Sequence, residues 1–299
     1  MCEASAFEVL VDVFSTSILI EALAPSKLST VSGYKGVKDL NIIHFIYTPH
    51  VIRRPLERIV SDSLEGRGFT LGRHLREYAL QALKHLLIGT NTAFGYLMLA
   101  IPLAYILGKA STLGDNLKSA RTVVDKYSPY VVEGLKKEGS GDFYSALKIA
   151  SMKHIGSYFG SIPSVTEEDE ELLNKTSLWD VLRDSMYIDL VSHEIVTGFR
   201  RVLEAYEYLS LREGLEDLLV RVTSVHTKLL GEYIDTLVLK SRGLNAALTL
   251  KHLSNLRRVV SDEAWAVIDT YVREQRLNPG SVSDIVAAGV ALYQVRRLC

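Results

Sequence analysis

The sequence GTNTAFGYLMLAIPLAYILG, residues 89–108, joins a polar turn framed by glycines to the most apolar run of the chain. No charged side chain occurs between Leu86 and Gly108. This run is long enough to cross a membrane, since about 20 apolar residues span a bilayer. It also suits a buried core helix, or a core helix whose first turn forms part of a ligand site.

A buried central helix is the interpretation that these residues favour. Polar and glycine residues occupy the first half of the run, Pro102 interrupts the second half, and no second apolar span follows. A helix that is apolar on all sides belongs in the core of a large protein. Thr90 or Asn91 is the predicted N-cap, so N–H groups of the first turn are left to attract phosphate or carboxylate. The alternative is that Asn91 only caps the helix.

The composition excludes several classes of protein. The 299 residues are 47% hydrophobic, which suffices for a substantial core, and 34 basic residues balance 35 acidic ones. That balance argues against a general nucleic-acid binder, which carries a basic excess. The two cysteines, Cys2 and Cys299, form no Cys-x-x-Cys pattern, so structural zinc and a disulfide framework are not expected. The N-terminus lacks the basic region of a signal peptide, which makes the cytoplasm the expected location.

Helical periodicity dominates the chain. Apolar residues recur at spacings of three and four in almost every long segment, and no stretch shows sustained alternation of the kind that strands need. The sequence therefore predicts an all-α protein, with one compact domain over residues 1–299 and ten to thirteen helices around the central one. Gly160–Lys175 is a weak domain boundary. Capping-box spacings occur at three places: Thr166 with Asp169, Ser177 with Asp180, and Ser281 with Asp284.

Four stretches resemble, in the same order, motifs of the triphosphoribosyl-dephospho-coenzyme A synthase family. The family's enzymes build the precursor of the citrate lyase and malonate decarboxylase prosthetic group. Together the stretches span nearly the whole chain. They are Glu21–Pro25 with Lys27–Val31 and the following Asp39, then Gly89–Gly95 with the apolar run after it, then Tyr233–Val238 with Gly243, and finally Asn278–Asp284; Ile188–Val191 and Val196–Phe199 fit less closely.

The chain also departs from the family pattern. Leu28-Ser29-Thr30 stands where the family has Pro-Gly-Asn, and Ala93 replaces the second asparagine of the central motif. Lys240-Ser-Arg-Gly243 stands where Arg-Lys-His-Gly is usual, and Ile188 replaces an arginine. These departures bear on the activity more than on the fold.

The resemblance implies a reaction in which the ribose C1′ of ATP is joined to the 2′-hydroxyl of dephospho-coenzyme A and adenine is released. A triphosphate needs cations and N–H donors. A magnesium ion needs carboxylates and phosphate oxygens. A carboxylate near the ribosyl transition state offsets its positive charge and can take the proton of the attacking hydroxyl.

The chain offers candidates for each of these roles. An acceptor other than dephospho-coenzyme A is an alternative. The catalytic candidates are Glu21, Asp235 and Asp284. The Mg²⁺ candidates are Glu21, Asp39, Asp235 and Asp284. The candidates for binding substrate are Lys27, Thr90, Asn91, Thr92, Gly95, Lys240, Arg242, Asn278, Gly280 and Ser281.

Simpler roles stand beside these. Asp284 would only complete a capping box with Ser281, and Asp235 would only lie on a helix surface. Glu21 is the most informative candidate, because its apolar neighbours make burial costly without a cation or donor. The eight histidines are scattered, and none has the His-x-x-x-His spacing of a zinc helix.

Three functions are therefore compared. The first is an ATP-dependent transferase that acts on small nucleotide substrates, without nucleic acid or membrane partners. The second is a nucleotide-binding or regulatory protein that has the same scaffold and has lost the chemistry. The third is a membrane-associated helical protein, which rests on Leu86–Gly108 alone. A homodimer is compatible with the sequence, which does not fix the oligomeric state.

Overall fold

The computed structural model describes residues 5–33, 35–150, 162–163, 170–214 and 217–298. Helices make up most of these residues and no β-sheet occurs among them, which confirms the all-α prediction. The helices are α1 (Ala6–Leu23), α2 (Ile42–Leu64), α3 (Gly72–Lys84), α4 (Phe94–Thr112), α5 (Ala120–Lys137), α6 (Gly141–Ile149), α7 (Glu170–Lys175), α8 (Leu178–Ser185), α9 (Leu190–Val196), α10 (Arg200–Leu211), α11 (Leu218–Glu232), α12 (Thr236–Arg242), α13 (Leu244–Leu256), α14 (Asp262–Glu274) and α15 (Gly280–Leu298).

The described residues form 15 helices, slightly more than the predicted ten to thirteen. One reason is that the segment after the capping-box spacing at Ser177 forms three separate helices, α8, α9 and α10. Asp189 caps the start of α9 by accepting a hydrogen bond from Ser192 N. Gly198 and Phe199 then adopt left-handed backbone conformations, with φ of 78° and 60°, so the helical path breaks before α10.

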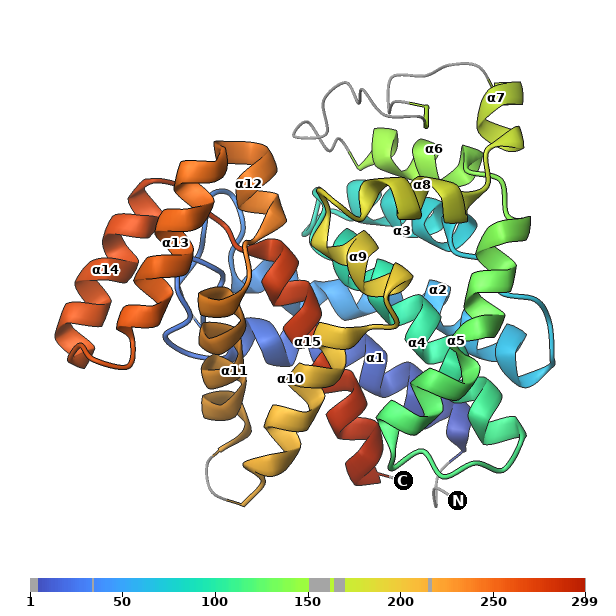
Figure 1. Ribbon diagram of the computed structural model, residues 1–299, viewed down its shortest axis with the longest axis horizontal. Coiled ribbons are helices and arrows are strands. Elements are labelled where there is room, and N and C mark those ends of the chain that lie inside the picture. Colours follow the sequence, from blue (N-terminus) through green and yellow to red (C-terminus); the bar gives the residue numbers. More distant parts are fainter. Residues whose placement is uncertain (1–4, 34, 151–161, 164–169, 215–216, 299) are drawn as a thin grey trace.

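The central helix is α4, which contains the apolar run. It packs against α1, α2, α5 and α15, and Figure 1 shows it inside the assembly of helices. By length and composition α4 qualifies as a membrane span, but 83% of its apolar window is buried inside the protein. The side chains that a membrane helix would present to lipid are thus covered by neighbouring helices, as the prediction of a core helix requires.

The remaining helices lie around this centre in two groups. In Figure 1, α11 to α14 lie at one side of the molecule and α5 to α8 at the other, while α1, α10 and α15 lie between them. The last helix, α15, packs against α1, α4, α10 and α11, so it connects the α11–α14 group to the central helices. At Gly289 of α15 an added Cβ would come within 2.6 Å of the Ala205 Cβ on α10, which explains the close approach of these helices.

The start of α4 differs from the prediction. The helix begins at Phe94 with Ala93 at the N-cap position, and neither Thr90 nor Asn91 occupies that position. The Asn91 side chain instead reaches forward and accepts a hydrogen bond from Phe94 N at 3.0 Å. The buried hydroxyl of Tyr78, from α3, accepts hydrogen bonds from Thr92 N and Ala93 N at 3.0 and 2.7 Å. A partner from another helix therefore satisfies N–H groups that the local pattern assigned to a local cap.

The predicted capping boxes have different outcomes. Ser177 caps α8, since its Oγ accepts a hydrogen bond from Asp180 N, which confirms the N-cap of the predicted box. The Asp180 carboxylate accepts from the Ser177 hydroxyl rather than from the Ser177 backbone N–H, so the second bond of a capping box is replaced. The prediction at Ser281 is wrong, because α15 already begins at Gly280. The Ser281 Oγ turns toward α12 and accepts a hydrogen bond from Leu237 N at 3.2 Å. The predicted capping box of Thr166 with Asp169 lies outside the described residues, and so do Cys2 and Cys299.

Replacement of Tyr78 by phenylalanine tests the contact that starts α4. We expect Tyr78→Phe to lower the free energy of unfolding by about 1–3 kcal/mol, because two N–H groups lose their acceptor in the protein interior. Urea unfolding followed by circular dichroism measures this change. Tyr271→Phe is the control, since Tyr271 is exposed. Equal stability of Tyr78→Phe and the unmodified protein would contradict the role assigned to the hydroxyl.

Candidate functional site

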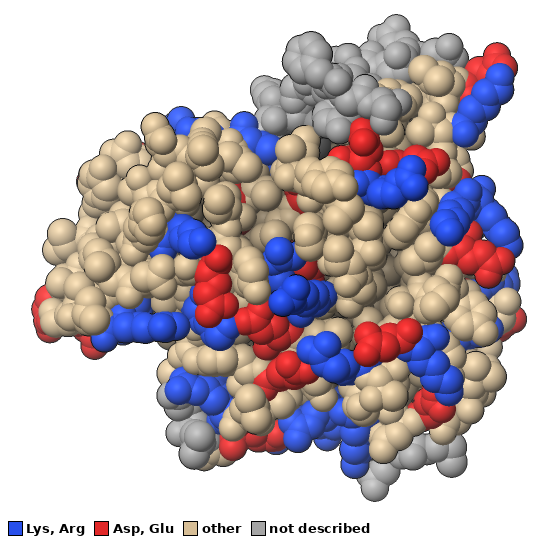
Figure 2. Space-filling view, in the orientation of Figure 1, with Lys and Arg blue, Asp and Glu red and all other residues tan. Residues whose placement is uncertain are grey.

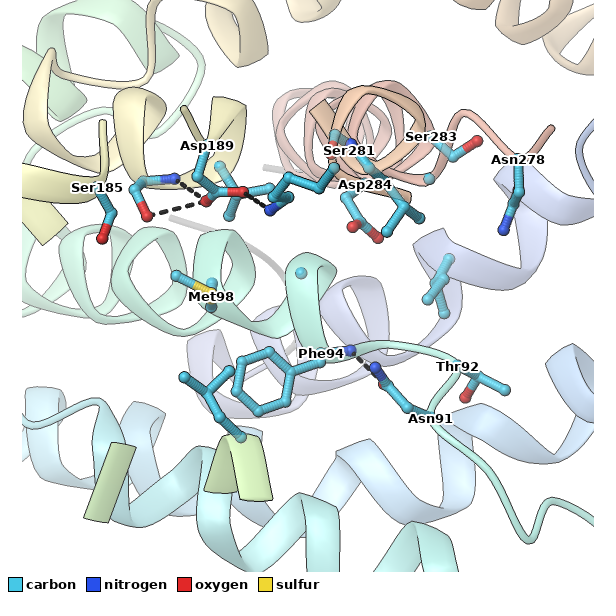
Figure 3. A pocket seen from close by; sticks show the side chains of 18 of the residues that line it. Asn91, Thr92, Phe94, Met98, Ser185, Asp189, Asn278, Ser281, Ser283 and Asp284 are labelled. Carbon is cyan, nitrogen blue, oxygen red and sulfur yellow. Dashed lines mark hydrogen bonds and ion pairs between the residues drawn. The ribbon is translucent and has the colours of Figure 1, made fainter. Parts of the chain in front are cut away.

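A cavity of about 240 Å³ lies where the start of α4 faces α9, α12 and α15. One part of its wall is apolar and includes Phe94, Met98 and Phe143. The other part is polar and carries the carboxylates of Glu21, Asp189 and Asp284. Figure 3 shows Asp189 and Asp284 on one side of this space and Phe94 with Asn91 on the opposite side.

Asp284 is held directly against the start of α4. An added Cβ at Gly95 would overlap Asp284 Oδ2, so only glycine allows this approach. The backbone N–H of Tyr96 also hydrogen bonds to the Asp284 carboxylate. Burial raises the pKa of Asp284 well above its ordinary value, and the nearby carboxylates of Glu21, Asp235 and Asp189 raise it further. The carboxylate thus occupies the anion position that the sequence predicted at this helix start.

Glu21 lines the cavity and forms a buried ion pair behind it. Lys27 Nζ lies 2.5 Å from Glu21 Oε1 and 2.6 Å from the Glu21 backbone oxygen. The Lys27 side chain is fully buried and is not part of the cavity wall. Burial raises the pKa of Glu21 and lowers that of Lys27, while the attraction between the two charges opposes both shifts. Lys27 is therefore the cation that Glu21 requires, and it lies too deep to line a substrate site.

A second ion pair crosses from α9 to α12. Lys240 Nζ lies 2.6 Å from Asp189 Oδ1, and the other oxygen of Asp189 accepts hydrogen bonds from Ser192 N and Oγ, both at 2.9 Å. Burial acts to raise the pKa of Asp189, but Lys240 and Ser192 outweigh it and hold the pKa below its ordinary value. Among the described residues of the cavity wall, Lys240 is the only lysine or arginine.

Asp235 has a structural position beside the cavity. Its Oδ1 accepts a hydrogen bond from Val238 N at the start of α12, and its Oδ2 accepts one from Val282 N in α15, both at 2.9 Å. The side chain is buried and does not line the cavity. Burial raises its pKa to about 6. Asp235 therefore ties α12 to α15, and both of its oxygens already have backbone partners.

The structure brings most, but not all, of the predicted site residues together. Asp39 and Arg242 are exposed, Thr90 is half-buried, and none of the three lines the cavity. Asp189 and Ser283 were not among the predicted site residues. Asp189 belongs to the weaker family-like element at 188–191, and this was the only signal for it. The predicted residues that do line the cavity are Glu21, Asn91, Thr92, Gly95, Lys240, Asn278, Gly280, Ser281 and Asp284.

Protein groups already occupy much of the α4 start. The N–H groups of Thr92 and Ala93 bond to Tyr78, that of Phe94 to Asn91, and that of Tyr96 to Asp284. Within the described part of the chain, no three His, Cys, Asp or Glu side chains are arranged to hold a metal ion. The arrangement is suited to placing carboxylates around a reacting group inside a largely apolar cavity.

Comparison with known proteins gives the family. The family model of ATP:dephospho-CoA triphosphoribosyl transferase matches residues 7–298. The fold is similar to the crystal structure of an Archaeoglobus fulgidus protein assigned as a triphosphoribosyl-dephospho-CoA synthase, with a TM-score of 0.58 and 16% sequence identity over 83% of this chain and 98% of that chain. At this identity the likeness concerns the fold alone. A search of curated proteins found no match to the chain.

The family match covers almost every residue from the first helix to the last. The chain is therefore a member of the ATP:dephospho-CoA triphosphoribosyl transferase family and an ATP-dependent transferase.

Proposed function

We propose that the cavity bordered by Glu21, Asp189 and Asp284 is where this transferase joins the ribose C1′ of ATP to the 2′-hydroxyl of dephospho-coenzyme A. The observation that carries the proposal is the charge of the wall. Three carboxylates line the cavity together with one lysine, and Lys240 is already paired with Asp189. Such a wall favours a group that becomes positively charged during the reaction.

The ribosyl group develops this kind of charge. As the bond between C1′ and the adenine nitrogen breaks, C1′ gains positive charge, and Glu21 and Asp284 stabilise it. The oxygen of the 2′-hydroxyl forms the new bond to C1′, and its proton passes to Asp284 as general base. The departing adenine takes up a proton, so the overall reaction neither gains nor loses one. The raised pKa of Asp284 makes this carboxylate a stronger base than an ordinary aspartate.

We assign the apolar part of the wall to the uncharged adenine ring. Phe94 and Phe143 lie with their ring centroids 6.2 Å apart, and Met98 lines the same cavity. Aromatic and thioether side chains form favourable contacts with flat rings. Asn91 and Asn278 supply polar groups at the cavity wall that can fix the orientation of the substrate.

We propose that magnesium enters with the nucleotide rather than as a resident ion. Lys27 forms an ion pair with Glu21, and Lys240 forms one with Asp189. Among the described residues, Asp284 has no lysine or arginine partner. Magnesium in proteins is usually held by one or two carboxylates together with substrate phosphates. Of the carboxylates that the sequence offered for the metal, Asp39 is exposed, Asp235 is occupied by backbone N–H groups and Asp284 is assigned to the base, so the phosphates would supply most ligands of the ion. When bound, the ion would offset charge on the phosphates.

We infer a cytoplasmic enzyme with a single domain over residues 1–299 that acts on small molecules and binds neither membranes nor nucleic acid. One hydrophobic cluster includes residues from α1 to α15, which supports a single domain. The burial of α4 argues against a membrane role. On the face in Figure 2, basic and acidic side chains are interspersed among the described residues, which does not suit a nucleic-acid surface. The homodimer stays a prediction.

The direct test is incubation with ATP, Mg²⁺ and dephospho-coenzyme A, followed by chromatography for free adenine. We expect adenine release, its loss when EDTA is added, and a decrease of at least about 100-fold in kcat for Asp284→Asn, which lacks the base. Asp39→Asn is the matched control and should retain the rate, because Asp39 lies outside the cavity. ATP binding without adenine release by the unmodified protein would favour the nucleotide-binding or regulatory protein instead.

The dependence of kcat on pH tests the role of Asp284 separately. A base must be ionised to accept a proton, and the pKa of Asp284 lies well above 3.8 in the folded protein. The rate should therefore fall as the pH decreases through a midpoint well above 4, and rise to a plateau above it. A rate that stays constant down to pH 4 would contradict Asp284 as the base.

Asp235→Asn distinguishes a structural aspartate from a catalytic one. The amide that replaces one carboxylate oxygen cannot accept a hydrogen bond, so Val238 N or Val282 N loses its partner. We expect a decrease of about 1–3 kcal/mol in the free energy of unfolding, with ATP affinity retained below the unfolding temperature. Thermal unfolding and calorimetric titration measure the two quantities. Unchanged stability with weakened ATP binding would reassign Asp235 to the substrate site.

A further inference from the structure

His226 is a fully buried histidine that lies directly behind the cavity. It belongs to α11, and its Nε2 lies 3.2 Å from Ser283 Oγ. Ser283 is part of the cavity wall and immediately precedes Asp284 in α15. In the described part of the chain, the other ring nitrogen of His226, Nδ1, has no hydrogen-bond partner. The roles assigned above to the cavity residues leave this histidine unexplained.

Ser283 is the meeting point of several polar groups. Its hydroxyl lies 3.3 Å from Thr30 Oγ1 and 3.2 Å from His226 Nε2, and Ser283 lines the same cavity as Glu21. The four residues come from α1, the loop before α2, α11 and α15. Burial raises the pKa of Glu21, and the Ser283 hydroxyl, acting as a donor toward the carboxylate, works with Lys27 to lower it.

The direction of each hydrogen bond follows from counting hydrogens. An ionised carboxylate only accepts, and a serine hydroxyl has a single hydrogen. Ser283 therefore donates to Glu21, which leaves its oxygen to accept from both His226 and Thr30. Burial and the charge of Lys27 lower the pKa of His226 well below its ordinary value, so the ring is neutral and has one N–H. That hydrogen is on Nε2, and Nδ1 has the lone pair.

We propose that His226 is a positioning residue of the transferase, which fixes the Glu21 carboxylate at the cavity through the chain His226 Nε2–H, Ser283 Oγ–H, Glu21. This inference rests on the proposed function, because it assigns Glu21 to the stabilisation of the ribosyl group. Lys27 binds the carboxylate from behind at Oε1, and Ser283 binds it beside the cavity. A glutamate held at one point only can still turn about its last torsion, whose energy profile is broad. The hydrogen bond from Ser283, whose direction is fixed by His226, prevents this rotation of the Glu21 carboxylate.

Two conservative variants of His226 separate positioning from packing. In His226→Gln the side-chain amide can place an N–H near the position of Nε2, whereas in His226→Asn the amide is too short and lies near Nδ1. We expect His226→Asn and Ser283→Ala to lower kcat for adenine release by about 10- to 100-fold with KM for ATP unchanged. His226→Gln should remain within a few-fold of the unmodified enzyme. His252→Gln is the control, because His252 is exposed on α13.

An equal decrease of kcat in His226→Gln and His226→Asn would overturn the proposal. A rise in KM of His226→Asn with kcat unchanged would also overturn it. Either result would assign His226 to packing or to substrate binding. Ser283→Ala keeps the test independent of the histidine pocket, since it removes only the hydroxyl. Retention of the full kcat in Ser283→Ala would also overturn the proposal.

The state of the ring can be measured without any enzyme activity. Nitrogen-15 NMR of the histidine side chains should report a neutral His226 with its hydrogen on Nε2, and a shift of that signal in Ser283→Ala. A hydrogen on Nδ1 would overturn the chain of hydrogen bonds. If the unmodified protein released no adenine, the transfer proposal would fail, and the NMR result would still decide whether the chain of hydrogen bonds exists.

Discussion

The close approach of the Asp284 carboxylate to the first turn of α4 is the contact on which the arrangement of the site depends. Gly95 allows it, because any side chain at that position would overlap the carboxylate oxygen. The N–H of Tyr96 stabilises it, since a negative charge is favoured at the start of a helix. This contact joins α4, the core helix, to α15, which also packs against α1, α10 and α11. The central helix therefore supports the fold along its length and the site at its first turn.

The cost of collecting carboxylates around one cavity is offset in three different ways. Glu21 has a buried lysine behind it, and Asp189 has Lys240 together with the start of α9. Asp235 is surrounded by backbone N–H groups of α12 and α15. Asp284 has the least compensation, and its pKa is raised by its burial and by repulsion from the neighbouring carboxylates. Such a group gains most from a positive charge brought by substrate, which is why we assign it the role closest to the reacting bond.

Sequence reasoning predicted the helices and the buried central helix because these depend on local periodicity. It also predicted that Glu21 needs a cation, since the apolar neighbours of Glu21 are adjacent in sequence. It did not predict which cation, or that Lys27 would be enclosed with Glu21 and kept from the substrate. The cap on α4 depends on Tyr78 from another helix, and the role of Asp235 depends on Val282 from another. Contacts of this kind join distant parts of the chain, and no local pattern contains them.

The charge of the cavity also bears on how a triphosphate can approach it. Three carboxylates line the wall, and its one lysine already has a partner, so the described wall offers little attraction for phosphates. A polyanion is repelled by buried carboxylates more strongly than by exposed ones, because the local dielectric is lower. We infer that only the ribose and adenine enter the acidic interior and that the phosphates stay toward solvent with their magnesium. The reaction requires affinity for a polyanion and stabilisation of a ribosyl cation. Separate regions of one site would then meet these two requirements.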